Sequence, residues 1–414
     1  MGRFAHISDV HLAAFDENNL RETNLNSFLW ALDECKKRNV DFIIITGDIF
    51  NRPNPDFLSI KDAIKKMREI VNNGIHIYTI SGSHDFSITG SSIYNILDAT
   101  GIIIDVHREN IDGDNIYLEP TVDEKTGASL YGMYGRRMGL ESYDYSKIKI
   151  KERNGYFSIF LFHSAISEVI PDIQFHMSEI PLEQIPKNMS YYAGGHVHRR
   201  IEKRIENYSI FYPGPLFASN YQDLEAMAKG EKRGFFIVDF SEKIENVEFV
   251  ENNVIPPILF EINAEGKIPE EIMREAIEKI EKEDLNNKYV LLKIYGELSS
   301  GKISEINRKK IIDYVKNKGA KGINININSL KSREYPEKII PADNVIDVEK
   351  NVFETYLKEY RTRENALNGE NGVKLAISLF NELKINRSEE ENSQDFENRI
   401  TDAAKRIFKE EEWK

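Results

Sequence analysis

The chain has 414 residues, of which 41% are hydrophobic and 30% charged. This composition is typical of a soluble globular protein with two or three domains. No run approaches the roughly 18 apolar residues of a membrane helix. The start, MGRFAHISDVHL, lacks the layout of a signal peptide, and the single cysteine, Cys35, excludes an internal disulfide, so we expect a cytoplasmic protein. The net charge of −13 argues against a protein that coats nucleic acid with its whole surface, but not against a local basic groove.

The first hundred residues alternate short apolar runs with amphipathic segments. The expected strands are residues 4–7, 42–46 and 75–80, and the expected helices are residues 24–37, 56–71 and 91–97. From residue 129 to 250 strands dominate, at 158–162, 191–193, 209–212, 235–240 and 247–250. The pattern predicts a layered α/β domain over residues 1–252, which a second sheet completes.

The composition changes at residues 252–257, which are typical of a linker. Beyond them we expect strands at 258–262, 289–294 and 322–327 and helices at 269–282 and 304–316, which together form a small α+β module over residues 253–330. The tail, residues 331–414, is helical and polar. Apolar stripes at helical spacing fall at Val348, Val352 and Tyr356, at Ala376, Leu379, Phe380 and Leu383, and at Phe396, Ile400, Ala404 and Ile407. These stripes fit either a helical subdomain that packs on its own body or a segment that binds a partner.

Five short polar segments follow predicted strands, at the points where those strands end. They are Asp9-Val10-His11, Gly47-Asp48, Gly82-Ser83-His84-Asp85, His163 and Gly195-His196-Val197-His198. A D-x-H or a G-D alone is a weak signal, and a lone histidine is more often a packed core residue than a ligand. The ordered set is much stronger, because the ends of strands in an open α/β sheet form its ligand-binding crevice.

The residue types indicate a metal centre. Carboxylates together with imidazoles suit borderline divalent ions such as Mn²⁺, Fe²⁺ or Zn²⁺ rather than a Ca²⁺ cage made of oxygens alone. A carboxylate that bridges two ions holds them about 3.5–4 Å apart, which suits hydrolysis of a phosphate ester. The glycines allow sharp turns and a close approach of the backbone.

The series of motifs resembles that of the calcineurin-like metallophosphoesterases. More narrowly, residues 1–250 resemble the meiotic-recombination-eleven nucleases, through HISDVHLA, ITGDIFNRPNP, SGSHDFS, FLFHSAISE, YYAGGHVHRR and FYPGP. The resemblance implies a two-layer β-sandwich flanked by helices, a small α+β capping domain and a helical C-terminal tail. It also implies exonuclease and single-strand endonuclease activity on DNA in double-strand-break repair.

The same resemblance implies a role for each residue of the centre. One divalent ion, expected to be Mn²⁺, would be held by Asp9, His11, Asp48 and His198. The second would be held by Asp48, Ser83, His163 and His196, so that Asp48 is the bridge. His84 would not be a ligand but would stabilise the transition state or protonate the leaving oxygen, and Asp85 would orient it.

Three positions depart from the family pattern. Ser83 stands where asparagine is usual, which replaces a carbonyl ligand with a shorter hydroxyl. Asn51 stands where relatives often have a histidine that positions DNA, which puts the efficiency of exonuclease action in doubt. Pro215 stands where serine is common and removes one N–H donor. Six of the metal ligands are unchanged, so the metal pair is still expected.

DNA and protein partners follow from the same resemblance. The candidates for DNA contact are Arg52, Arg136, Arg137, Arg199 and Arg200, with Lys203 and Arg204 beside them; a solvated charged face is the alternative for each. The expected protein partners are a second copy of the chain and an SMC-like ABC ATPase with a long coiled coil, which the C-terminal helices would bind.

Two other functions remain open. The first is a phosphoesterase that acts on small molecules or phosphoproteins, although such an enzyme needs neither a cap nor a helical tail. The second is a scaffold that binds DNA ends and whose catalysis has decayed through Ser83 and Asn51.

Overall fold

The computed structural model describes residues 1–85, 87, 92–135, 142–151, 155–170, 179–332, 353–354, 369–384 and 393–410. Internal contacts divide the chain into two compact units, residues 1–331 and 332–414, which we describe separately. None of the described helices is both long and apolar enough to cross a membrane.

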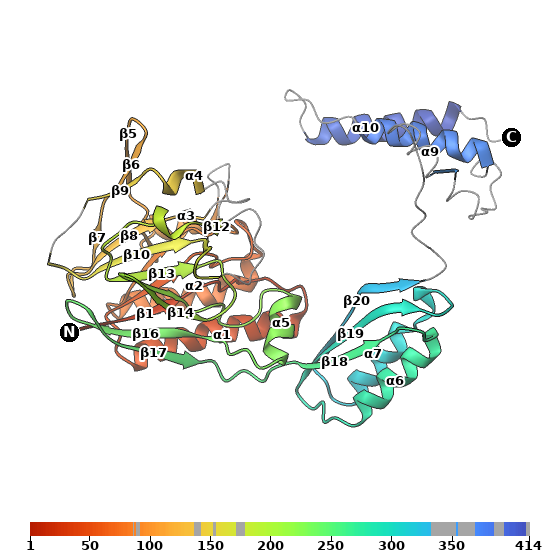
Figure 1. Ribbon diagram of the computed structural model, residues 1–414, viewed down its shortest axis with the longest axis horizontal. Coiled ribbons are helices and arrows are strands. Elements are labelled where there is room, and N and C mark those ends of the chain that lie inside the picture. The colour runs from red at the N-terminus through yellow and green to blue at the C-terminus, as the bar shows by residue number, and fades with distance from the viewer. Residues whose placement is uncertain are drawn as a thin grey trace. The chain divides into compact units, whose positions relative to one another are not determined.

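The first sheet of unit 1 is mostly parallel and has six strands (Figure 1). Their order is β17 (Ile244–Glu251), β16 (Gly234–Phe240), β1 (Gly2–Ile7), β2 (Phe42–Thr46), β3 (His76–Ile80) and β4 (Ile104–Asp105). The strands from β1 to β4 are parallel, and β16 joins β1 in the antiparallel sense. Strand β2, with the sequence FIIIT, is buried on both faces, as its run of β-branched residues predicts.

The second sheet also has six strands and a parallel centre. Their order is β14 (Ile201–Ile205), β15 (Tyr208–Tyr212), β13 (Tyr191–Gly195), β10 (Ser158–His163), β8 (Ser129–Met133) and β7 (Thr121–Val122). Two smaller sheets accompany it: β5 (Glu109–Asp112), β6 (Asn115–Leu118) and β9 (Ile148–Ile150), and the pair β11 (Ala165–Ile166) and β12 (Glu179–Ile180).

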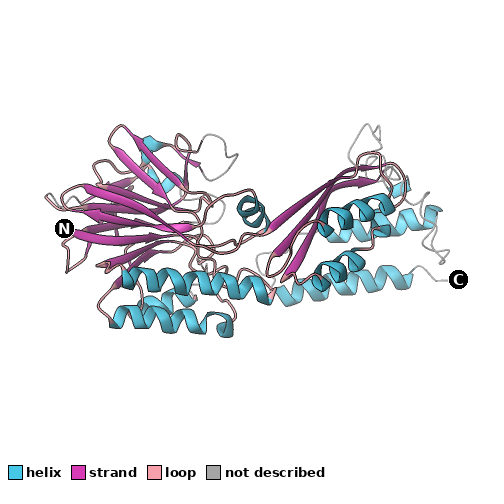
Figure 2. Cartoon of the chain, turned by 90° about the horizontal axis from the view of Figure 1, so that it is seen from below, coloured by secondary structure: helices cyan, strands magenta, loops and turns pink. Residues whose placement is uncertain are grey.

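The two large sheets face each other across one apolar core. Alternate residues of β2 divide between two sides: Phe42 and Ile44 contact the second sheet, whereas Ile43 and Ile45 pack against helices. These helices are α1 (Asn18–Lys37), α2 (Phe57–Asn72) and α3 (Ile93–Ala99), and Figure 2 shows long helices beside the strands. The expected two-layer sandwich flanked by helices is confirmed.

The strand register brings the expected polar segments to one edge of the sandwich. In the first sheet Ile7 pairs with Ile45, and Thr46 pairs with Ile80, so the carboxyl ends of three parallel strands are level. In the second sheet His163 pairs with Gly195. The residues that follow these five strand ends therefore converge, as expected for polar residues placed at the carboxyl ends of parallel strands.

Several elements differ from the sequence-based expectation. Helix α1 begins at Asn18 rather than at residue 24. Its first turn carries Leu20, which is buried with Phe217 and Tyr289 in an apolar cluster shared by the sandwich domain and the small module. The short elements α4 (Ser142–Tyr145), β14 and α5 (Tyr221–Ala228) were not expected. Asn220 caps the start of helix α5, and its side chain accepts a hydrogen bond from the backbone N–H of Asp223.

The small module consists of a three-stranded sheet with two helices. Its strands are β18 (Ile258–Asn263), β19 (Tyr289–Leu298) and β20 (Gly322–Ser332), and its helices are α6 (Pro269–Glu281) and α7 (Arg308–Asn317). It has its own apolar core and also touches the sandwich through Tyr289 and Leu291, which pack against Leu224 of α5. We propose that residues 253–330 are a domain distinct from residues 1–252 on the basis of this separate core.

In the described part of unit 2, the helices α9 (Gly369–Leu383) and α10 (Ser393–Glu410) pack on each other. The ring of Phe353 lies against that of Phe380, with centroids 5.7 Å apart. Most of the first expected tail helix, around Val348 and Tyr356, lies outside the described residues. Leu383 is exposed, so part of the apolar stripe of α9 is uncovered within this unit.

Candidate metal centre

The loop after β1 carries Asp9 and His11 into the interior. The hydroxyl of Ser8 donates to one oxygen of Asp9, and the backbone N–H of His196 donates to the other at 3.0 Å. The backbone N–H of His11 donates to the carbonyl of Asp48 at 2.9 Å. The loop is therefore tied to the residues that follow β2 and β13.

Asp48 lies at the centre of the cluster. Its Oδ2 is 3.2 Å from Nε2 of His163 and 3.5 Å from Nε2 of His11, and its Oδ1 accepts a hydrogen bond from the backbone N–H of His84 at 2.8 Å. All of these groups except His84 are buried. One carboxylate thus faces imidazoles from both sheets, which is the position that a bridging ligand requires.

Glycines allow the segments to approach so closely. A Cβ on Gly195 would lie 1.9 Å from the carbonyl oxygen of Thr46, and a Cβ on Gly82 would lie 2.2 Å from Oδ1 of Asp48. Neither position could hold a side chain without moving the backbone that carries the cluster.

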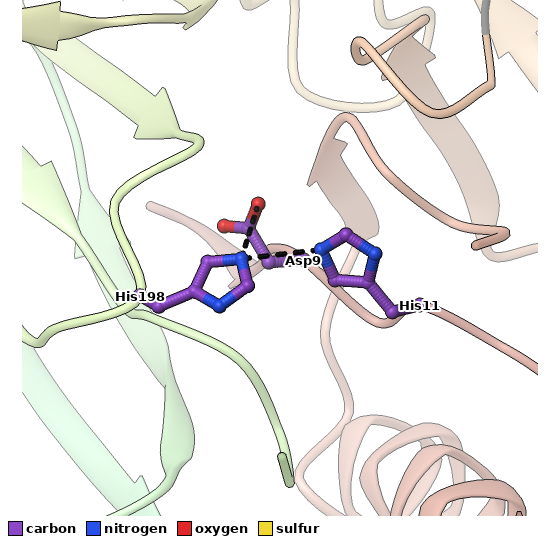
Figure 3. Close-up of side chains that lie close together, drawn as sticks. All are labelled: Asp9, His11 and His198. Atoms are coloured by element: carbon purple, nitrogen blue, oxygen red, sulfur yellow. Dashed lines mark hydrogen bonds and ion pairs between the residues drawn. The ribbon is translucent and has the colours of Figure 1, made fainter. Parts of the chain in front are cut away.

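Figure 3 shows the second group of side chains, Asp9, His11 and His198. The Nε2 atoms of His11 and His198 are 3.1 Å apart, and Nε2 of His198 is 3.8 Å from Oδ1 of Asp9. One ligand atom from each of the three side chains lies within 4.8 Å of the others, and the same holds for Asp9, Asp48 and His163. These are two of three overlapping groups of described residues that could hold metal ions, and the third contains His84.

Backbone strain is concentrated in this cluster. Among the described residues, nine that are not glycine have a positive φ, and four of the nine are candidate ligands: Asp9 (49°), His11 (47°), Asp48 (51°) and His196 (78°). Each residue in this left-handed region costs on the order of 1–3 kcal/mol and persists only where its surroundings hold it there. The fold thus maintains these side chains at a cost in stability, which is characteristic of functional sites.

The hydrogen bonds of the imidazoles favour a cation between them. Because a carbonyl oxygen only accepts, Nδ1 of His163 must donate to the carbonyl of Thr46, at 2.8 Å. In the neutral ring, Nε2 then carries a lone pair that faces the carboxylate of Asp48, so two hydrogen-bond acceptors face each other. Burial alone would lower the pKa of His163, but the attraction of the Asp48 carboxylate for the imidazolium is larger and raises this pKa to about 10. A cation is favoured here, a proton in the metal-free chain and a metal ion where one binds, so the donor set fits a metal centre.

The ionisation states of His11, His196 and Asp48 agree with ligand roles. Burial lowers the pKa of His11 and of His196 to about 3, so both rings are neutral near pH 7 and retain a lone pair. Burial alone would raise the pKa of Asp48, but the neighbouring His163 and His11 hold it well below the usual range. Neutral imidazoles with an ionised carboxylate are the forms that bind divalent ions.

A family model, the calcineurin-like phosphoesterase, matches residues 2–200, the segment that supplies every candidate ligand. Residues 2–200 are a calcineurin-like phosphoesterase domain. Members of this family carry a centre of two divalent metal ions, and the clustered groups of the chain agree with such a centre.

The similarity to curated relatives extends beyond this phosphoesterase domain. A protein of Methanocaldococcus jannaschii named DNA double-strand break repair protein Mre11 is 26% identical over 93% of this chain and 95% of its own length. Proteins of the same name from Archaeoglobus fulgidus and Sulfurisphaera tokodaii are 25% and 28% identical, over 75% and 68% of this chain and 72% and 70% of their own lengths. The similarity thus includes parts of the chain beyond residue 200.

His84 and Asp85 lie beside the metal-ligand cluster of the phosphoesterase domain. Nδ1 of His84 donates to the carbonyl of Asn51 at 2.9 Å, and His84 forms a third close group with His11 and Asp48. The carboxylate of Asp85 accepts hydrogen bonds from the backbone N–H groups of residues 49, 50 and 82. Asp85 therefore ties the loop after β2 to the loop after β3. It would position His84 by holding these loops, rather than by a hydrogen bond to the imidazole ring.

Ser83 is half-buried in the same turn, and its role as a ligand stays a prediction.

The predicted DNA-contact residues lie in three places. Arg52 is exposed just after the Asp48 loop, and Arg199 is exposed next to His198. Arg200 stacks over the ring of Phe249 at 4.2 Å and pairs with Glu202 at 2.9 Å, so its side chain is partly engaged within the fold. Lys203 and Arg204 are exposed on β14, and Arg136 and Arg137 lie outside the described residues.

Two buried polar residues near His198 were missed from the sequence, Asp223 and Arg233. Nδ1 of His198 donates to the carboxylate of Asp223 at 2.9 Å. Burial opposes ionisation of this carboxyl group, but His198 and Arg233 lower the pKa of Asp223 to about 2. The motif Asn220-Tyr221-Gln222-Asp223, an N-cap residue followed by an acidic first turn, was the available signal.

Proposed function

We propose that the chain is a DNA nuclease of double-strand-break repair that hydrolyses phosphodiesters with two Mn²⁺ ions, as an exonuclease and as a single-strand endonuclease. The buried cluster centred on Asp48, at the edge where both sheets end, carries the proposal. The relatives named for DNA double-strand break repair support the choice of DNA as substrate, because the similarity extends beyond the phosphoesterase domain.

The side chains divide the chemistry between them. Asp9, His11, Asp48, His163, His196 and His198 would hold the two ions, which, when bound, supply a hydroxide nucleophile near neutral pH and offset charge on the phosphoryl oxygens. Attack on phosphorus breaks the bond to one ester oxygen, and that oxygen must gain a proton. The imidazolium form of His84 can supply it from Nε2, since Nδ1 is anchored on the carbonyl of Asn51.

Exposed basic residues would bind the DNA backbone beside the centre. Arg52 and Arg199 each follow a candidate metal ligand closely in sequence and are exposed. Contacts to DNA phosphates come mainly from exposed arginine and lysine side chains. Arg52 and Arg199 are therefore better candidates for DNA contact than Arg200, whose guanidinium already stacks on Phe249.

A nuclease assay with Mn²⁺ tests the proposal. The purified chain is incubated with an end-labelled duplex, with single-stranded circular DNA, with bis-p-nitrophenyl phosphate and with a phosphopeptide. We expect both DNA substrates to be cut and the phosphopeptide to be left intact. Hydrolysis of the phosphopeptide or the small ester without DNA cleavage would favour a phosphoesterase of another class. DNA binding without any cleavage would favour an end-binding scaffold.

Ser83 should weaken one of the two metal sites. Its hydroxyl is shorter than an asparagine carbonyl, so we expect the site of Asp48, His163 and His196 to fill after the site of Asp9, His11 and His198. Changes of this kind typically cost about 10–100-fold in metal affinity or activity. Ser83→Asn should therefore lower the Mn²⁺ concentration needed for half-maximal cleavage, as titration by calorimetry and by activity would measure. Two equally tight sites in the parent chain would contradict this prediction.

The tail should serve the protein partners, which we propose to be a second copy of the chain and a coiled-coil ABC ATPase. A chain that ends near Ala342 keeps the whole of unit 1, so we expect it to cleave short DNA but not to bind the ATPase. Amphipathic helices bind partner grooves through anchors such as Phe396 and Ile400. A chain that ends at Lys384 keeps α9 but lacks α10, and it shows which of these two helices binds. Aggregation or unfolding of the shorter chain would favour a subdomain that packs on its own body.

A further inference from the structure

The ring of His198 is held from the side opposite the metal-ligand cluster. Its Nε2 atom lies near His11 and Asp9, whereas its Nδ1 atom is 2.9 Å and 3.1 Å from the two carboxylate oxygens of Asp223. Because an ionised carboxylate only accepts, the proton of the neutral ring must be on Nδ1. The lone pair of Nε2 then faces the cluster.

Asp223 is itself fixed by its neighbours. Oδ2 accepts hydrogen bonds from the backbone N–H of Ser219 at 2.9 Å and from its hydroxyl at 3.0 Å. The residue lies in the first turn of α5, where Asn220 caps its backbone N–H. Its side chain is 5% exposed, so little water can replace any of these partners.

Arg233 completes the arrangement from the segment before β16. It lies directly before β16, and its buried guanidinium donates to the carbonyl of His198 at 2.7 Å and to the carbonyl of Asp223 at 3.2 Å. It also lies 3.7 Å from the carboxylate of Asp223. Its guanidinium also donates to the carboxylate of Glu231 at 2.9 Å. One buried cation thus holds the backbone of His198 and lies near two carboxylates, those of Glu231 and Asp223.

We propose that Asp223, supported by Arg233 and Ser219, is the positioning residue of His198, which fixes the ring with Nε2 free to bind metal. The inference rests on the proposed function only in taking His198 as a metal ligand. A carboxylate behind a histidine ligand sets the tautomer and orientation of the ring and raises its basicity, and loss of such a group typically costs about 10–100-fold in metal affinity or activity.

The Asp223→Asn variant separates this role from a structural one. Asparagine keeps the size of the side chain, but its amide can donate to Nδ1 and so favour the tautomer whose Nε2 carries a proton and cannot bind metal. A matched control is Asp239→Asn. Asp239 is also a buried carboxylate paired with arginine, at 2.6 Å from Arg3, but it lies toward the amino-terminal end of β1, away from Asp9.

Binding of Mn²⁺ alone is measured by calorimetry for the parent chain and both variants, with melting temperatures beside it. We expect Asp223→Asn to weaken one site by about 10–100-fold and the other much less. Asp239→Asn should keep both affinities. Parent-like affinity at both sites in Asp223→Asn, or equal weakening in the two variants, would overturn the proposal.

A spectroscopic measurement on the parent chain serves if Asp223→Asn does not fold. Histidines labelled with ¹⁵N report which ring nitrogen carries the proton, and His198→Gln identifies the signal. In the protein loaded with Zn²⁺, we expect the proton of His198 on Nδ1. A proton on Nε2 would overturn the proposal. Neither measurement uses DNA, so an absence of DNA cleavage would refute the proposed function and leave this inference standing.

Discussion

The Asp48→Ala variant is expected to lose both metal ions and all nuclease activity while it remains folded. Among the described residues, Asp48 is the carboxylate that lies within 3.5 Å of imidazoles from both sheets, those of His11 and His163. Without it, two cations would lie close together with no negative charge between them to offset their repulsion. Metal content after dialysis against Mn²⁺, circular dichroism and cleavage of a labelled duplex measure the three outcomes.

Asp41→Ala is the matched control for this variant. Asp41 directly precedes β2, whereas Asp48 follows the same strand, and its carboxylate pairs with Lys125 and the backbone N–H of Arg3 rather than with the centre. We expect it to keep both metals and the parent rate. If Asp48→Ala still cleaves DNA at a tenth or more of the parent rate, the chain does not work through a metal pair bridged by this residue.

The His84→Ala variant is expected to keep both metal ions and to lose about 10²–10⁴ in rate, the usual contribution of a general acid. His84 is half-buried, and its ring is anchored by the carbonyl of Asn51 rather than by a neighbouring carboxylate. His84 lies close enough to His11 and Asp48 to be a metal ligand as well. The metal content of the variant therefore decides between a ligand and a proton donor. Single-turnover cleavage at saturating Mn²⁺ isolates the chemical step.

His163→Ala provides the contrast. It removes a ring that faces Asp48 at 3.2 Å, so it should release metal as well as lower the rate. Equal loss of metal in the two variants would mean that His84 is a ligand, and the assignment of proton transfer to His84 would then fall.

The sequence predicted the candidate ligands because each one follows a strand. Once β1, β2, β3, β10 and β13 are parallel and level, the residues after them must meet at one edge, whatever the details of packing. Residues 42–45 are all apolar, and successive side chains of a strand point to opposite faces of the sheet. A strand with this sequence must therefore be covered on both faces, as β2 is in the sandwich. Local patterns were sufficient for these features.

The partners of those ligands could not be predicted in the same way. Asp223 reaches His198 from a helix 25 residues further along the chain, and Arg233 comes from a segment still further on. No periodic pattern connects such segments, since only the folded loops bring them together. The basic residues around Arg200 in the sequence favoured a role in DNA binding. Its stacking on Phe249 of β17 could not be predicted, because the two residues are distant in the sequence and only the fold brings them together. The strained backbone at Asp9, His11 and Asp48 is equally invisible in residue types alone.

The most direct test of the metal centre is anomalous diffraction from crystals of the chain soaked in Mn²⁺. We predict two anomalous peaks about 3.5–4 Å apart, with the carboxylate of Asp48 between them and His198 bound through Nε2 to the ion shared with Asp9 and His11. A single peak, or peaks away from Asp48, would contradict the account.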